Sequence, residues 1–220
     1  MADFKATLAT LAQAEEFHLT CAQVQGLLLD DNFLGELFQR CQIVKHALGF
    51  VQIRLGNING KAIRLHLWSR ESVLTSVSAG SEIHSHPWPL RSFVLCGSIN
   101  NRIYEVVESD SGTDELYKVE RHGKRVHHTR LHVRVSWKIV STRLIHAGSS
   151  YAIDVSTFHS TDFAESGSLT LIVVGQRKGL PARVVKPLDG PTTIIKAPVL
   201  LSESGNRLVR ESIIEMLRRV

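Results

Sequence analysis

Two closely spaced histidines and one distant histidine are the residues of this sequence best suited to chemistry. His84 and His86 lie in the segment Ile-His-Ser-His-Pro-Trp, and His159 follows more than seventy positions later. Side chains at i and i+2 of an extended segment project from one face, so the two imidazoles of the pair lie side by side. A third histidine from another strand would complete a facial set of ligands with open positions. The spacing therefore predicts a metal site in a small metalloenzyme.

The elements that must position these histidines are predicted to be β-strands. From residue 50 to about residue 176, short alternating or β-branched runs are separated by turn residues, with almost no helical pattern between them. Such a series predicts a sandwich or a barrel. Gly97 and Ser98 separate two of the runs and predict a hairpin turn. The expected strands are 63–68, 72–78, 91–96, 99–107, 115–119, 129–140, 149–155 and 169–175.

Helices are expected on both sides of this β region. Apolar residues recur at helical spacing before Gly49, and Asp30, Asp31 or Asn32 is expected to cap the second helix. After residue 178 the sequence is first rich in proline and then amphipathic from about Ser204. The length favours one domain with appendages. We expect a helical segment at 1–48, a β-barrel at 49–178, and a tail with a helix at 179–220.

Two motifs around the histidines resemble those of the cupin superfamily. They span residues 80–97 and 148–159, each beginning with a glycine. In cupins the first motif supplies an HxH pair and a glutamate, and the second supplies a single histidine. The second motif departs from the pattern at Asp154 and Ser156, where proline and glycine are usual. The resemblance covers residues 60–175 and implies a mainly β fold, the cupin-type double-stranded β-helix or jelly-roll barrel.

The metal ligands implied by this resemblance do not include a carboxylate. The glutamate position of the first motif falls at or next to Arg91, and no acidic residue lies between His86 and Gly97. Arginine cannot ligate a metal or lose its charge. The remaining ligands are His84, His86 and His159. Such a site resembles that of the three-histidine dioxygenases of the superfamily, and His-Ser-His-Pro is similar to the HxHP stretch of the cysteamine and plant cysteine oxidases.

The resemblance implies a non-haem iron dioxygenase, an oxidoreductase that oxidises a small thiol- or carboxylate-bearing substrate with dioxygen. Three neutral imidazoles leave the metal dipositive, so an anionic substrate would supply the missing negative charge. Fe²⁺ is the favoured cofactor, and zinc, nickel, manganese and copper are the alternatives. Two other functions stay open. One is a non-oxidative metal-dependent lyase or isomerase, and the other is a non-catalytic cupin that binds a small ligand.

Several further residues are candidates for roles around the metal. If Arg91 points inward, its planar fork suits a substrate carboxylate; a one-residue slip of register would turn it outward. Arg64 and His66 share a strand face that either lines the pocket or points away from it. Tyrosines near the metal would donate hydrogen bonds, with packing as their alternative role. The catalytic candidates are Arg91, Tyr104 and Tyr151, and the substrate-binding candidates are Arg64, His66, Trp88 and Arg91.

One basic stretch, residues 121–134, stands out from otherwise scattered charges. His128, Arg130, His132 and Arg134 alternate along a predicted strand and are expected on one face. No aromatic platform is interleaved with them, which disfavours a nucleic-acid surface. A solvated sheet face or part of a subunit interface is the favoured interpretation.

Composition restricts the class of protein further. The chain has 220 residues, a net charge of +5 and three widely spaced cysteines that form no CxxC pair, which favours reduced thiols. No apolar run approaches the roughly 20 residues needed to span a bilayer, and the N-terminus lacks a signal-peptide pattern. We expect a soluble cytoplasmic protein with no membrane or nucleic-acid partner. The resemblance to cupins implies a homodimer.

Overall fold

The computed structural model describes residues 17–46, 48–69, 82–123 and 125–219. The expected strand at 72–78 and the first part of the N-terminal helical segment lie outside these residues. The described chain is mainly β, as predicted. Its helices are α2 (Phe17–Leu29), α3 (Asp31–Arg40) and α4 (Glu203–Arg218). Its strands are β1 (Gln42–Lys45), β2 (Val51–Ile58), β3 (Lys61–Trp68), β4 (His84–Ser85), β5 (Leu90–Glu108), β6 (Asp114–His122), β7 (Arg125–His146), β8 (Ser150–Ile153), β9 (Phe158–Val174), β10 (Ala182–Pro187), β11 (Thr193–Lys196) and β12 (Val199–Leu200).

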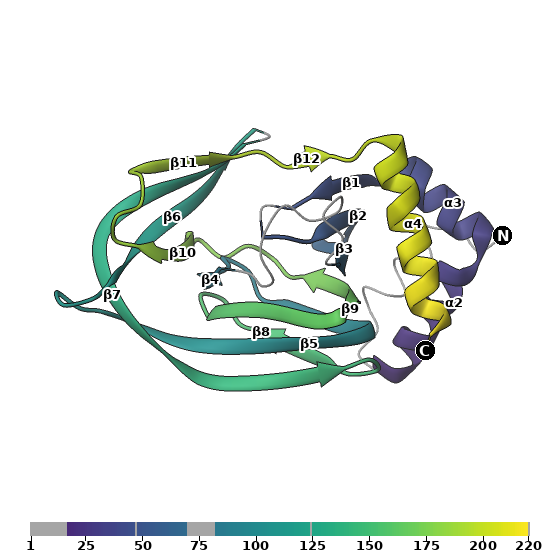
Figure 1. The fold of residues 1–220 in the computed structure, drawn as a ribbon, viewed down its shortest axis with the longest axis horizontal. Helices are drawn as coiled ribbons and strands as arrows, with labels where there is room; N and C mark the ends of the chain where they lie inside the picture. The colour runs from purple at the N-terminus through teal and green to yellow at the C-terminus, as the bar shows by residue number, and fades with distance from the viewer. Residues whose placement is uncertain (1–16, 47, 70–81, 124, 220) are drawn as a thin grey trace.

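The strands form one antiparallel sheet that closes on itself. Neighbouring strands follow the order β12-β1-β2-β3-β9-β4-β10-β6-β7-β5-β8, and an additional pairing joins β9 to β5. The ring β9-β4-β10-β6-β7-β5 is thereby closed into a barrel, while β1, β2 and β3 extend the sheet from β9 (Figure 1). This closed antiparallel arrangement is consistent with the jelly-roll architecture implied by the motifs.

The three helices pack together at one end of the molecule, against the extended part of the sheet (Figure 1). The apolar face of β3, formed by Ile63, Leu65 and Leu67, is buried in a cluster with Leu34 of α3 and Ile213 of α4. Burying such side chains between helix and sheet is the main stabilising contribution available to this layer. Because the helices cover this face, the opposite, polar face of β3 points away from them, toward the interior of the molecule.

Local capping explains where two of these helices begin. The Asp30 carboxylate accepts a hydrogen bond from the Phe33 amide at 2.8 Å, and Ser202 Oγ accepts one from the Gly205 amide at 3.2 Å. Side-chain acceptors at the N-cap satisfy amides that have no partner within the helix. The cap expected near Asp30 is therefore present, and α3 ends at Arg40, before the expected end at about residue 48.

The expected hairpin at Gly97 and Ser98 is wrong, because β5 continues through both residues. The ladder between β5 and β9 shifts register around Gly97, which has a φ of +73°. A Cβ at this position would lie 2.3 Å from the carbonyl oxygen of Gly167. Glycine is thus required by a β-bulge and a close backbone approach, which produce the same sequence signal as a turn.

Strands also occur in segments outside the expected β region. Residues 42–45, within the expected N-terminal helical segment, form β1, and residues 182–187, within the expected tail, form β10. Strand β10 lies between β4 and β6 in the barrel wall. The expected C-terminal helix is present as α4. The three-part division of the chain stays a prediction.

Candidate metal centre and cavity

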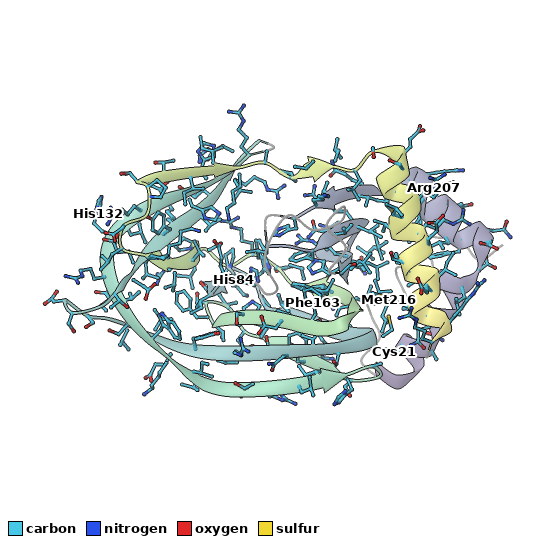
Figure 2. The ribbon with its side chains drawn as sticks, viewed as in Figure 1. Cys21, His84, His132, Phe163, Arg207 and Met216 are labelled. Atoms are coloured by element: carbon cyan, nitrogen blue, oxygen red, sulfur yellow. The ribbon has the colours of Figure 1, made fainter. Side chains whose placement is uncertain are left out.

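Three histidines from two distant parts of the chain converge inside the barrel. Strand β4 pairs with β9 so that His84 lies directly opposite His159, and His86 follows β4. The ring centroids are 4.4 Å apart for His84 and His159, 4.7 Å for His84 and His86, and 5.2 Å for His86 and His159. One ring nitrogen of each lies within 4.8 Å of the others. Figure 2 shows His84 in the interior of the molecule.

Burial keeps these imidazoles in the form that binds metals. The exposed fraction is 9% for His84 and 4% for His159. Desolvation by burial lowers the pKa of His84. Burial also lowers the pKa of His86 and His159 well below the usual range, with smaller contributions from neighbouring histidines and, for His86, from Arg64. Only the neutral imidazole has a lone pair for a metal, so this environment favours the ligand state.

The hydrogen bonds of the cluster also fit a metal ion. His84 Nδ1 lies 2.7 Å from the backbone carbonyl oxygen of Glu82, and because that oxygen only accepts, Nδ1 carries the proton and Nε2 keeps its lone pair. His159 has neither ring nitrogen hydrogen-bonded within the described part of the chain, although both are buried. Unsatisfied buried polar atoms are costly. A cation held by His84, His86 and His159 would satisfy them.

A cavity of about 640 Å³ opens beside the three histidines. This volume suits a small molecule. One wall is aromatic: His66 stacks on Phe50 with centroids 4.1 Å apart, and Trp68 lies 4.6 Å from Phe50. Trp88 stacks on His86 at 5.6 Å. The ligand set is therefore reached from a cavity with both apolar and polar walls.

Four of the predicted substrate-binding and catalytic residues line this cavity. These are Arg64, His66, Trp88 and Tyr151. The polar face of β3 points inward, one of the two orientations that the sequence left open, because the helices bury the apolar face. Burial raises the pKa of the Tyr151 phenol, so Tyr151 is a neutral hydroxyl at ordinary pH.

The structure does not bring the other two candidates to the site. Arg91 is exposed and is not among the residues that line the cavity, which answers the question of register left open by the sequence. Ile103, not Tyr104, pairs with His159, so the Tyr104 side chain points to the opposite face of the sheet. There its hydroxyl lies 2.8 Å from Ser160 Oγ. The roles expected for Arg91 and Tyr104 at the metal have no support in this placement.

The basic stretch does not form one solvated face. His132 has a φ of +57°, and the ladder between β6 and β7 shifts register beside it, so the alternation expected from the sequence is broken. His128 is only 5% exposed and lines the cavity, whereas Arg134 is exposed. His132 lies at the outer rim, far from His84 (Figure 2).

Sequence reasoning assigned no firm role to Glu82, whose side chain lies at the edge of the site. Its carboxylate accepts a hydrogen bond from Lys186 Nζ at 2.7 Å and lies 3.5 Å from Lys196 Nζ. Burial opposes ionisation, but the hydrogen bond and charge of Lys186 lower the pKa of Glu82. The pairing connects β10 and β11 to the backbone carbonyl that holds His84, and no local sequence pattern indicates it.

Comparison with known proteins finds only distant structural similarity. No protein-family model matches the sequence, and no curated protein is similar to it. An oxalate decarboxylase from Lactobacillus farciminis, solved as a formate complex, is similar over 64% of this chain and 32% of its own, at 13% identity and a TM-score of 0.39. An RmlC-like cupin from Shewanella frigidimarina is similar over 64% of this chain and 88% of its own, at 12% identity and a TM-score of 0.38.

A third similar structure is hydroquinone 1,2-dioxygenase PnpCD with Cd²⁺ and 4-hydroxybenzonitrile, over 56% of this chain and 62% of its own, at 10% identity and a TM-score of 0.34. The chain thus spans about a third of the decarboxylase and less than two thirds of the dioxygenase. The cupin resemblance of the motifs is confirmed in this chain by its closed antiparallel barrel and its three clustered histidines.

Proposed function

We propose that this protein is a metal-dependent enzyme whose His84, His86 and His159 hold Fe²⁺, and that it oxidises a small substrate with dioxygen. The observation that carries the proposal is His159, whose two ring nitrogens are buried without a hydrogen-bond partner among the described residues, beside two further neutral imidazoles and a cavity. No carboxylate belongs to the described ligand cluster. Bound Fe²⁺ would supply redox chemistry and open positions for a substrate.

The residues of the chain itself would bind and orient the substrate. His84 is fixed by the carbonyl oxygen of Glu82, so its lone pair is aimed without rearrangement. Trp88, Phe50 and Trp68 exclude water from part of the cavity, while Tyr151 offers a neutral hydroxyl. Arg64 supplies positive charge to the cavity wall for an anionic group of the substrate.

The test is elemental analysis of protein purified without oxygen, followed by oxygen-uptake measurements with candidate substrates. We expect about one iron per chain, and loss of both metal and oxygen uptake in His84→Ala, His86→Ala or His159→Ala. Metal retained in each single variant would refute the ligand assignment. Turnover of a substrate under anaerobic conditions would instead favour the non-oxidative lyase or isomerase, with zinc, nickel or manganese as the ion.

Some expectations remain predictions. None of the helices in the described parts of the chain is both long and apolar enough to cross a membrane. The cytoplasmic location and the homodimer therefore stay predictions.

The three cysteines are free, and burial raises the pKa of each to about 11, so their thiols are protonated at neutral pH.

A further inference from the structure

The cavity beside the histidines carries a large excess of positive charge. The cationic side chains that line it are Arg54, Arg64, Arg121, Arg177, Arg183 and Lys196. The carboxylates that line it are Glu82 and Glu120, and each is already paired with lysine: Glu82 with Lys186 and Lys196, and Glu120 with Lys118. No ion pair joins any of the five cavity arginines to a carboxylate of the described residues.

Two of these arginines face each other directly. Arg54 of β2 and Arg64 of β3 are partners in the antiparallel ladder, so their side chains leave the sheet together on the cavity face. Like charges at such positions destabilise a sheet. Burial, together with the charges of Arg54 and Arg121, lowers the pKa of Arg64 to about 10. The repulsion is therefore present in the folded protein, and an anion would relieve it.

Arg54 is held in position by neutral groups. Its Nε donates to Gln52 Oε1 at 3.1 Å, and its Nη1 donates to Gln42 Oε1 at 2.7 Å. The Gln52 amide in turn lies 3.2 Å from His66 Nε2. Glutamine amides fix a guanidinium in place without cancelling its charge, which is the arrangement expected of a preorganised anion site.

Arg64 connects this pair to the metal centre. Its side chain is half-buried, lines the cavity, and forms no hydrogen bond or ion pair with any described residue. The three histidines line the same cavity as Arg64. The site therefore offers two positively charged groups that can bind anions. One is the cation that the histidines would hold, and the other is the arginine pair.

We propose that Arg54 and Arg64, together with the more exposed Arg121, bind an oxyanion of the substrate, and that the substrate is a small molecule with at least two anionic groups and no ammonium group. One anionic group would lie at the histidine centre and the other at the arginines, whose planar forks match carboxylate or phosphate oxygens. We expect an ammonium group to be repelled, because five arginines without an ion-pair partner among the described residues line the cavity and both of its carboxylates are paired with lysines. Only one part of this inference rests on the proposed function, namely the placement of one anionic group of the substrate at the metal.

The test is calorimetric titration of the protein with succinate, inorganic phosphate and aspartate, in the metal-loaded and chelator-treated forms. We expect succinate or phosphate to bind, and the stronger of the two identifies the oxyanion as carboxylate or phosphate. Aspartate, which adds an ammonium group to succinate, is expected to bind about tenfold more weakly than succinate or not at all. Neither anion binding at millimolar concentration, or aspartate binding as well as succinate, would overturn the proposal.

Arginine variants test whether the anion binds at the pair formed by Arg54 and Arg64. Arg64→Gln is expected to weaken binding of the anion about tenfold, and Arg64→Lys less, because lysine keeps the charge but not the fork. Arg91→Gln is the matched control, since Arg91 is exposed and outside the cavity. Equal weakening in Arg91→Gln and Arg64→Gln, or no change in Arg64→Gln, would refute the assignment. Thermal melting identifies any variant that fails to fold, and Arg54→Gln then tests the same pair.

These experiments distinguish failure of the proposed iron enzyme from failure of the proposed anion site. In His159→Ala the metal is expected to be lost while the arginine pair stays in place, so inorganic phosphate or succinate should still bind, with lower affinity. Anion binding without metal binding would refute the proposed iron enzyme and leave the anion site standing. Metal binding without anion binding in the wild-type protein would refute the anion site alone.

Discussion

His84 and His159 lie directly opposite each other across β4 and β9, with their rings 4.4 Å apart, although 74 residues separate them in the chain. This pairing makes the ligand cluster a property of the barrel wall and not of a loop. Sites held by paired strands keep their geometry better than sites on loops. The metal centre is therefore expected to depend on β9 as much as on the HxH pair.

Replacement of His159 by alanine should abolish metal binding. Two ligands would remain, and the cation would lose the imidazole whose nitrogens have no described alternative partner. We expect the metal content to fall from about one ion per chain to near zero, measured by elemental analysis after gel filtration. His132→Ala is the control, because His132 is exposed at the rim. Equal metal content in His159→Ala and the control would contradict the assignment.

Acidification should destabilise the metal-free protein below about pH 6.5. Burial, with the charges of Lys196 and Lys186, lowers the pKa of His128 to about 4 from its ordinary 6.5. Between pH 6.5 and pH 4, His128 is protonated in the unfolded chain but stays neutral in the folded chain. Stability is therefore full above pH 6.5 and falls as the pH decreases toward 4, with a slope of up to about 1.4 kcal/mol per pH unit for each such group.

Urea unfolding at a series of pH values checks this dependence. His46 contributes in the same direction, since burial and the charges of His84 and nearby arginines lower its pKa to about 3. In His128→Gln the slope should decrease, and in His132→Gln it should not change. A stability that is constant from pH 7 to pH 4.5 would show that His128 is not a buried neutral group.

Gly97→Ala should destabilise the barrel. The residue has a φ of +73°, and an added Cβ would meet the Gly167 carbonyl oxygen at 2.3 Å. We expect the free energy of unfolding to fall by at least about 2 kcal/mol, measured by urea denaturation. Gly35→Ala in α3 is the matched control, because nothing lies within 4 Å of its added Cβ. That substitution should raise stability by about 1 kcal/mol.

Leu144→Glu should weaken the expected homodimer. From Ser136 onward β7 pairs with β5 only, and the opposite edge has no strand partner in the described ranges. Trp137, Ile139 and Leu144 on this part of β7 are 43%, 50% and 61% exposed. Light scattering should give twice the 24.5 kDa of one chain for the wild type and a lower mass for the variant. Leu180→Glu, at an exposed leucine outside this strand, should leave the mass unchanged.

The sequence was sufficient to locate the ligand cluster, because the HxH pair is local and the cupin motif supplied the spacing to His159. It was also sufficient for the mainly β fold and for α4. It was not sufficient for Arg91, because alternation along a strand fixes which residues share a face but not which face turns inward. That choice depended on the helices, which bury Ile63, Leu65 and Leu67 and thereby turn Arg64 and His66 into the cavity.

The arginine pair could not be predicted for a related reason. Arg54 and Arg64 lie ten residues apart, and only the register of β2 and β3, with its bulge after Arg54, places them opposite each other. The same limit applies to His128, because a bulge beside His132 changes which residues of β7 face inward. Bulges insert one residue without a distinctive sequence signal, so alternation counted across them assigns the wrong face.

The position of β10 between β4 and β6 has a consequence for the newly synthesised chain. All three histidines have been made once residue 159 has been added, yet the barrel wall stays open until residues 182–187 pair with both neighbours. Pairings between distant segments form late during folding. Until then a ribosome-bound chain would present the imidazoles to water on an incomplete wall. Insertion of the metal is therefore expected only after residues 182–187 have joined the wall, and metal supplied later should load the folded protein.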